Sequence, residues 1–291
     1  MADQVEQADI RTLDIDKVVK GIADVDYVFK KYCTNSSTNG DSIRWYQQTA
    51  GDLSVTAPSA TANVSPLSLP ASLAVTWTRN TSYPRKYFVS GFLSMEDMKT
   101  TDVSAYSTTL KMLTRRIIKD VDTRIWNVMS ESQTAVNLNS VTTTSIGGDQ
   151  WDAASLAGNP IKDLLRAQKL IMDGGYKLSD LVLFVSPLDY ESLLNWIYGK
   201  GAQSLELGAD IVKTGVLTKL LSMDVVVSPN VTADYALVAT KGVTATWYTL
   251  VDTTAVSIEN KGIGTEIRVW EEGEAILNDP KSACLIIDTQ T

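Results

Sequence analysis

Hydrophobic residues recur at helical spacing over one unusually long stretch in the middle of the chain. Apolar side chains stand at steps of three and four from residue 103 to 131, with Asp122 and several basic residues on the opposite side. This spacing predicts one amphipathic helix of about 43 Å, capped by Asp102. Its length is far above that of an average helix, and the charge pattern of a coiled coil is missing. We therefore expect the helix to lie across a β-sheet.

Helical and extended patterns alternate after this long helix. Asn159 and Pro160 predict the start of a helix that ends at a pair of glycines. The apolar run 181–185 predicts a buried strand. Ser186 opens a further helix, with Asp189 three positions on as its capping partner. This order predicts a compact α/β unit that is separate from the long helix.

The C-terminal part of the chain is rich in β-branched and aromatic residues. Four runs, YALVA, ATWYTLV, AVSIEN and EIRVWEE, predict four short strands with turns between them. The last run, residues 283–287, is apolar throughout and predicts a strand that is buried on both faces. No internal repeat is visible. The chain as a whole is therefore predicted to have an α+β fold.

Before the long helix, the patterns predict little regular structure. Residues 1–31 predict an arm with one short helix, which Asp14 or Asp16 caps. Residues 42–56 and 84–94 both predict strands. We expect these two strands to flank a long tip and to form an extended hairpin.

The tip of that hairpin has an unusual composition. Residues 45–78 contain Asp52 as their only charged residue, and three prolines exclude a helix. Disorder driven by charge does not explain the stretch, because the charges are missing. A segment of this length without a regular pattern is unusual inside a compact domain. We therefore expect something outside its own domain to cover it, which favours assembly over chemistry.

The charge balance and hydropathy narrow the possible functions. With 26 basic and 34 acidic residues, the net charge of the 291 residues is −8, which disfavours general nucleic-acid binding. The densest local basic groups are Arg115, Arg116 and Lys119, and the pair Lys30 and Lys31, and for each a solvated face is the alternative. No apolar run is long enough to span a bilayer, and no signal-peptide pattern is present.

Residues for catalysis or metal binding are scarce in the sequence. Histidine is absent, and Cys33 and Cys284 make neither a disulfide framework nor a metal motif. The Gly-rich stretch after residue 199 does not match a phosphate loop. Glu271 and Glu272, with Glu274 close behind, are not predicted to form an acid–base pair, because adjacent strand residues point to opposite faces. A polar strand end next to a turn is predicted in its place. We predict no catalytic residue, no cofactor and no metal, so the protein is not expected to be an enzyme.

The order of these predicted elements resembles the major capsid proteins of tailed double-stranded DNA viruses, which have the Hong Kong 97-like fold. The stretch RKYFVSGFLSMEDMKTTDVSAYSTTLKMLTRRIIKDVDTRIWNVM resembles the family's second extended-loop strand and its spine helix. Residues 159–231 resemble its axial domain, in the order helix, strand, Ser-Pro-initiated helix, Gly-rich loop and short strand. The resemblance covers nearly the whole chain.

The resemblance implies a division of the chain into four parts. These parts are an N-terminal arm (1–40), an extended loop (41–98), a peripheral domain (99–148 and 245–280) and an axial domain (149–244 and 281–291). It also implies assembly through hexamers and pentamers into an icosahedral shell. The shell would enclose DNA without sequence-specific binding and without a membrane. The protein would be part of the virion, be assembled in the host cytoplasm, and have scaffold, portal and decoration proteins as further partners.

Some members of this family join subunits through a bond between an asparagine and a lysine on the extended loop. Residues 45–78 contain no lysine, and the nearest one, Lys86, stands at the base of the loop. We therefore predict assembly without covalent cross-linking at the loop tip. Charged residues at the subunit interfaces are predicted, with simple solvation as the alternative: Glu96, Asp97, Arg115, Arg116 and Arg268.

Two other functions are weighed against a viral shell. An encapsulin, a cellular compartment with the same fold, would enclose a cargo enzyme in place of DNA. An α/β enzyme built on residues 150–290 would need a convergent polar site, and the sequence contains none without histidine. The contents of purified particles separate the first alternative from a virus, and a monodisperse monomer in solution would favour the second.

Overall fold

The computed structural model describes residues 15–23, 26–48, 77–100, 105–144, 149–153, 158–199, 217 and 219–290. Most of the charge-poor stretch 45–78, the predicted caps Asp14 and Asp102, and most of the Gly-rich stretch lie outside the described residues. The chain divides into two compact units. The first unit comprises Met1–Ile43, Thr81–Ile125 and Trp247–Ile276, and the second comprises Arg44–Asn80, Trp126–Thr246 and Leu277–Thr291.

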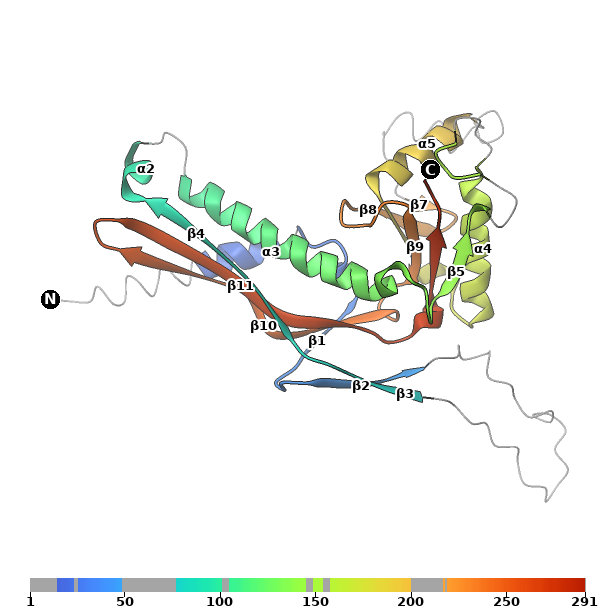
Figure 1. Cartoon of the computed structure of the whole chain (residues 1–291), viewed down its shortest axis with the longest axis horizontal. Helices are drawn as coiled ribbons and strands as arrows, with labels where there is room; N and C mark the ends of the chain where they lie inside the picture. Colours follow the sequence, from blue (N-terminus) through green and yellow to red (C-terminus); the bar gives the residue numbers. More distant parts are fainter. Residues whose placement is uncertain are drawn as a thin grey trace, which may run out of the picture. The chain divides into compact units, whose positions relative to one another are not determined.

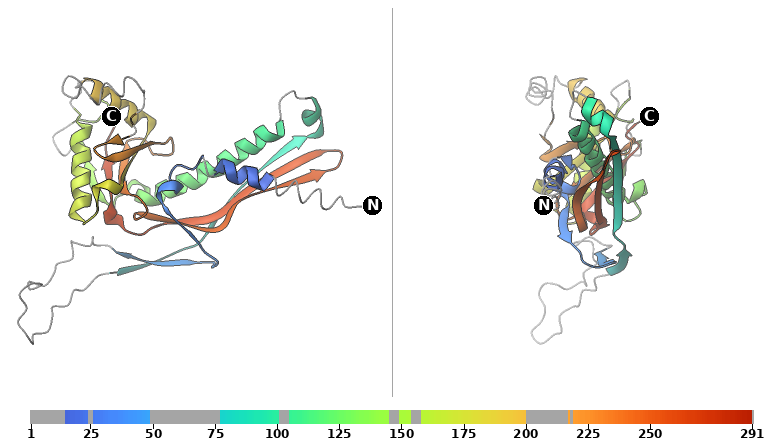
Figure 2. Two further views of the ribbon diagram at one scale, coloured as in Figure 1. Left: turned by 180° about the vertical axis from the view of Figure 1, so that it is seen from behind. Right: turned by 90° about the vertical axis from the view of Figure 1, so that its left-hand side faces the viewer.

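The first unit is built from one long helix and a sheet of long strands (Figure 1). Its four-stranded sheet has the order β1-β10-β11-β4. Helix α3 lies along this sheet, and Gly91 of β4 leaves room for Leu113 and Thr109 of the helix (Figure 2). The strands and the helix have these bounds: β1 Thr34–Ser37, β4 Arg85–Ser94, α3 Ala105–Met129, β10 Ala245–Asn260 and β11 Gly264–Leu277.

The long amphipathic helix is confirmed in α3, although its described part is shorter than predicted. Leu110, Ile117 and Val121 on its apolar face are buried, while Lys111 and Lys119 are exposed. Near the N-terminus, residues 15–23 form the predicted short helix, whose Val19 is fully buried. A 3-10 turn, Lys30–Tyr32, and a further short helix, α2 (Met95–Thr100), complete the unit.

Two predictions about strands were wrong. ATWYTLV and AVSIEN are not separate strands, because β10 runs without a break from Ala245 to Asn260. The polar residues between them continue the alternation, since Thr253 points inward and its hydroxyl donates to Glu271 Oε2 at 2.8 Å. The predicted hairpin also pairs differently. Strand β2 (Ile43–Gln48) pairs with β3 (Trp77–Ser82), whereas β4 pairs antiparallel with β11.

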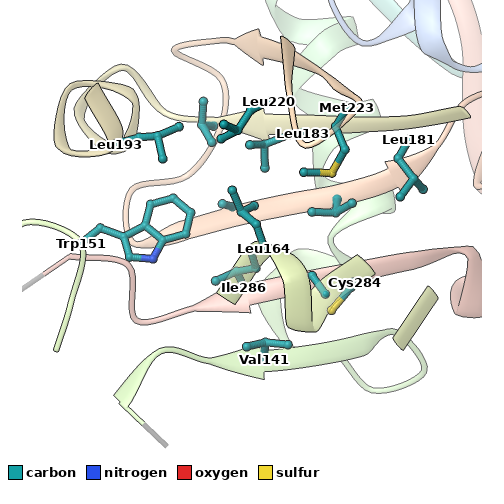
Figure 3. Packing of buried hydrophobic residues seen from close by; sticks show 14 of the residues in the cluster. Val141, Trp151, Leu164, Leu181, Leu183, Leu193, Leu220, Met223, Cys284 and Ile286 are labelled. Carbon is teal, nitrogen blue, oxygen red and sulfur yellow. The ribbon is translucent and has the colours of Figure 1, made fainter. Parts of the chain in front are cut away.

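The second unit contains a six-stranded mixed sheet with a helix packed against it. Figure 3 shows from close by the buried side chains that form its core. The strand order is β5-β12-β9-β6-β8-β7, in which β6 is parallel to β8 and antiparallel to β9. Helix α4 packs on β5 and β12. The bounds are β5 Asn139–Thr142, α4 Pro160–Asp173, β6 Leu181–Val185, α5 Pro187–Gly199, β7 Lys219–Leu220, β8 Met223–Val227, β9 Tyr235–Thr240 and β12 Ala283–Ile287, with short 3-10 turns at Glu131–Gln133, Leu178–Asp180 and Pro280–Ser282.

The core of the second unit is apolar and confirms the predicted buried strands. All five residues of β6 are buried, and so are the first four of β12. Around them pack Trp151, Leu164 and Leu193 from flanking segments. The predicted helix starts are confirmed as well. The Asn159 side chain accepts a hydrogen bond from Lys162 N at 3.1 Å, and Ser186 Oγ accepts one from Asp189 N at 3.1 Å.

Candidate functional site

The five charged residues predicted for interfaces all lie in the first unit, on three different elements. Glu96 and Asp97 occupy the first turn of α2, where Ser94 Oγ accepts a hydrogen bond from Asp97 N at 3.0 Å. Arg115 and Arg116 lie in the middle of α3, and Arg268 lies on β11. The fold thus distributes these residues over one unit and does not gather them into a single site.

Each of the three arginines has a carboxylate partner within its own chain. Arg115 Nε lies 3.1 Å from Asp26 Oδ2, and Arg116 Nε lies 3.2 Å from Asp120 Oδ2. Both guanidinium groups are largely exposed, so these pairs contribute little to stability.

Arg268 binds the neighbouring carboxylate of its own strand with two hydrogen bonds. Its Nε and one terminal nitrogen donate to the two oxygens of Glu266 at 2.8 and 3.0 Å. These hydrogen bonds lower the pKa of Glu266. The pair is a partly exposed charge group that another chain could contact.

A shallow cavity of about 280 Å³ lies beside Arg115. Its lining is formed by Gly21, Ile22, Asp26, Lys111 and Arg115. The structure describes all five predicted residues. Among them, Arg115 alone lines this cavity. The mixture of two cations, one carboxylate and an apolar side chain is suited to contact with a protein surface, and it offers no group that is arranged for catalysis.

Buried carboxylates in the first unit are the main feature that the sequence did not predict. Glu271 and Glu274 are fully buried and lie inside β11, which continues to Leu277, so the predicted polar strand end is wrong. Glu271 binds Lys30 Nζ at 2.8 Å and also accepts a hydrogen bond from the Tyr27 hydroxyl. Glu272, on the other face, pairs with Lys86 at the surface.

Glu274 is held by two arginines from different elements. Arg124 Nε of α3 donates to Glu274 Oε1 at 2.7 Å, and Arg85 Nε of β4 lies 3.1 Å from Oε2. These contacts join the long helix to two neighbouring strands. A buried carboxylate needs such partners, because removing a charge from water costs far more than burying an apolar group.

A third buried carboxylate, Asp122 of α3, holds the N-terminal segment. Its two oxygens accept hydrogen bonds from Val28 N at 2.8 Å and Phe29 N at 3.2 Å. Burial raises the pKa of Asp122 to about 6, and the backbone hydrogen bonds oppose this shift. The carboxylate thereby holds the backbone directly before the turn Lys30–Tyr32 from a position far away in the sequence.

One sequence signal could have identified Glu271. Strand residues of equal parity share a face, and Ile267 and Val269 of the same parity are buried. No comparable signal predicts its partner, because Lys30 stands 241 positions earlier.

The opposite face of the same sheet carries exposed aromatic side chains. Phe88 and Phe92 of β4 are 51% and 52% exposed, while Val89 and Leu93 alternate with them and are less accessible. In the β4–β11 register, Phe88 stands beside Trp270 and Phe92 beside Glu266. Lys86 Nζ lies 5.9 Å from the Trp270 ring, which is within the range of a cation–π contact. This exposed stripe is a second surface suited to contact with protein.

Groups for chemistry are not brought together in the described parts of the chain. No cluster of three or more metal-ligating side chains occurs among the described residues. Cys33 and Cys284 are separate buried thiols, and burial raises the pKa of each to about 12. No helix within the described ranges is long and apolar enough to cross a membrane.

Comparison with known proteins gives a family for this arrangement. A family model described as phage capsid protein matches residues 92–286, which include α3, β10 and β11 of the first unit and most of the second. No curated protein sequence matches the chain.

Several solved structures share the fold. The capsid of the cyanophage P-SCSP1u is 14% identical, with a TM-score of 0.64, and the match covers 90% of this chain and 88% of that one. Mycobacterium phage Che8 is 15% identical, with a TM-score of 0.61 and coverages of 87% and 86%. A virus-like particle from Pyrococcus furiosus is 11% identical, with a TM-score of 0.61 and coverages of 95% and 99%. At these identities the likeness concerns the fold.

Proposed function

The chain belongs to the phage capsid protein family, and from this premise we propose how its two units build a shell. The protein is a major capsid protein that forms an icosahedral shell, and it is a structural component of the virion and not an enzyme. The match of the family model to residues 92–286 carries this conclusion. The same match disfavours the encapsulin and enzyme alternatives.

The two units have different tasks in this proposal. The first unit supplies the peripheral domain, in which α3 and the long strands extend toward neighbouring subunits. The second unit supplies the axial domain, which meets its copies around the axes of hexamers and pentamers. The separate cores of the two units support this assignment, because each unit keeps its own packing when their arrangement differs between hexamers and pentamers.

The extended loop and the surface charges complete the proposed contacts. The charge-poor stretch 45–78 covers a neighbouring subunit, for which its neutral composition is suited. Glu96, Asp97, Arg115, Arg116 and Arg268 contact other subunits at the periphery. Scaffold, portal and decoration proteins bind the assembled shell, which encloses DNA without reading its sequence. Assembly takes place in the host cytoplasm.

Electron microscopy of the purified chain tests the shell. We expect closed particles in which hexamers and pentamers are visible. A monodisperse monomer under all assembly conditions would contradict the proposal. Nuclease-resistant DNA inside native particles supports the enclosed genome, whereas a folded protein cargo without DNA would overturn that part.

Denaturing electrophoresis of mature particles tests how the loop is held. Because residues 45–78 contain no lysine, we expect a single monomer band without reducing agent. A ladder of bands of higher mass would show covalent joining and contradict assembly by packing alone.

A further inference from the structure

The turn that follows helix α3 has an unusual backbone. Four residues that are not glycine have left-handed φ angles within five positions: Glu131 (46°), Ser132 (54°), Gln133 (66°) and Ala135 (46°). Side chains other than glycine and asparagine disfavour this region, because the Cβ atom approaches the carbonyl oxygen. Such conformations persist only where the surroundings fix them, and they cluster at functional sites.

Hydrogen bonds hold this turn in its strained form. The Glu131 carboxylate accepts hydrogen bonds from Asn137 N at 2.7 Å, Asn137 Nδ2 at 2.9 Å and Leu138 N at 3.2 Å. Gln133 Nε2 donates to Thr232 Oγ1 at 2.9 Å, which ties the turn to the neighbouring turn before β9. Ser130 and Leu138 at the two ends of the turn are buried. The turn is therefore rigid at both ends and along its length.

This rigid turn exposes an apolar side chain. Val136 is 76% exposed, the largest value among the large hydrophobic residues that the structure describes. A single exposed valine is ordinary on a protein surface. Here, however, the backbone that carries Val136 is strained and held by hydrogen bonds. The valine side chain is therefore presented in one position.

The chain segments next to Val136 in the sequence carry no charge. Residues 132–144 contain no charged side chain, and neither do residues 225–233, which include Thr232 and the neighbouring turn. The one carboxylate at the start of the turn, Glu131, is occupied by the three hydrogen bonds within it. Uncharged segments beside an exposed apolar side chain fit a protein partner and not a polyanion such as DNA.

We propose that residues 130–138 form a preformed docking turn, and that its Val136 packs into a second copy of this chain. The inference rests on the proposed shell, in which every subunit is surrounded by copies of itself. A fixed turn loses little conformational entropy on binding, so even a small contact of this kind strengthens assembly. The site lies in the second unit and is separate from the charged residues of the first.

A cysteine at position 136 tests the burial directly. The two natural cysteines are buried, so Val136→Cys adds one accessible thiol. We expect this thiol to react with a maleimide dye in the unassembled subunit and to be protected in particles made from the purified chain alone. Val243→Cys is the matched control, because Val243 also lies in a turn of the second unit and is 39% exposed. Its thiol should react in both states.

The possible results separate the docking turn from the shell itself. Equal labelling of Val136→Cys in subunits and particles would overturn the docking turn and leave the shell intact. If the thiol were protected in native virions but not in particles of the pure chain, a different protein would cover it. This result would contradict the proposal that a second copy of this chain is the partner. If the unaltered chain formed no particles at all, the result would contradict the proposed shell and not the docking turn alone.

A polar substitution measures the contribution of the contact. Val136→Asp should raise the critical concentration for assembly about tenfold, because it removes one buried valine and places a charge in an apolar contact. Its melting temperature should equal that of the unaltered subunit, since the side chain is exposed before assembly. A critical concentration within about twofold of the unaltered chain, which is less than 0.5 kcal/mol, would contradict the proposal.

Discussion

The two units differ in how they bury carboxylates, apart from Asp122 of the first unit, which backbone amides hold. In the second unit, Asp163 and Asp189 lie in the first turns of helices and bind nearby donors, Trp151 Nε1 at 3.0 Å and Ser186 Oγ at 2.7 Å. In the first unit, Glu271 and Glu274 lie in the middle of a sheet and bind cations from distant parts of the chain.

This difference indicates where each unit is sensitive to change. A carboxylate at a helix start is stabilised by the helix dipole and by backbone amides, which no single substitution removes. A carboxylate that depends on one lysine or arginine loses its main partner when that residue is replaced. We therefore expect substitutions of buried charges to destabilise the first unit more than the second.

Replacement of Lys30 should have the largest effect. Lys30→Met leaves Glu271 buried without its cation, and this should lower the free energy of unfolding by about 3 kcal/mol. Chemical denaturation of the subunit measures the loss. The double variant Lys30→Met with Glu271→Gln should recover part of the stability, because the uncompensated charge is gone.

The matched control is the more exposed pair of Lys86 on β4 and Glu272 on β11. Lys86→Met removes the partner of Glu272, and the lysine side chain is 56% exposed. Its effect should stay below about 1 kcal/mol. If Lys30→Met were no more destabilising than Lys86→Met, the contrast between buried and exposed pairs would not hold.

The stability of the first unit should also depend on pH through Asp122. Its pKa is about 6 in the folded chain and 3.8 in the unfolded one, so the folded state binds the proton more tightly. This contribution is fully present below about pH 4 and is lost as the pH rises through 6, with a total of about 3 kcal/mol. Asp122→Asn should lack this fall, although it also alters the two hydrogen bonds to the backbone.

Comparison of the two proteins at each pH isolates the effect. The difference in unfolding free energy between the unaltered chain and Asp122→Asn should shrink steadily from pH 4 to 7. Burial also raises the pKa values of Asp163 and Asp189. Both residues are present in both proteins, so their contributions to the pH dependence cancel in the difference. A difference that is constant over this range would show that Asp122 does not titrate in it.

Close packing at the end of β11 gives a smaller effect. A Cβ atom on Gly273 would stand 2.5 Å from Trp247 Cζ2 and 2.7 Å from Tyr248 O. Gly273→Ala should therefore destabilise the chain by about 1–3 kcal/mol, measured as a lower denaturation midpoint. Gly21→Ala is the control of opposite sign, since no atom lies within 4 Å of its added Cβ and alanine favours the helix. A destabilised Gly21→Ala variant would count against this explanation.

Loss of a helix cap in the second unit should have the smallest effect. Ser186→Ala removes the side chain that accepts from Asp189 N, and the expected loss is about 1 kcal/mol. Thermal unfolding measures it, and Ser186→Thr should retain most of the stability. An effect larger than that of Lys30→Met would reverse the order of the two units.

Local signals predicted much of this fold. The period of α3, the caps at Asn159 and Ser186, and the buried runs of β6 and β12 all depend on residues close together in the sequence. The unbroken strand β10 was missed because polar residues in its middle resemble a turn until the buried partner of Thr253 is known.

The contacts that hold the first unit together could not be predicted in the same way. Asp122 binds residues 93 and 94 positions away, and Glu274 binds Arg124 at a separation of 150. Such contacts are decided by how α3 packs against distant parts of the chain and not by local spacing. The docking turn was missed for a related reason, since none of its left-handed residues is a glycine or asparagine that would mark it.

The short sheet of β2 and β3 has a consequence for how this chain can change in evolution. These strands pair with each other, and Asn80 Nδ2 donates to Gln47 Oε1 at 2.7 Å across the pair. Once the ends are joined, doubling the length of the chain between them costs only about 0.6 kcal/mol of closure entropy. Insertions between β2 and β3 should therefore change the stability of the two units little. The length of this segment can thus vary in evolution.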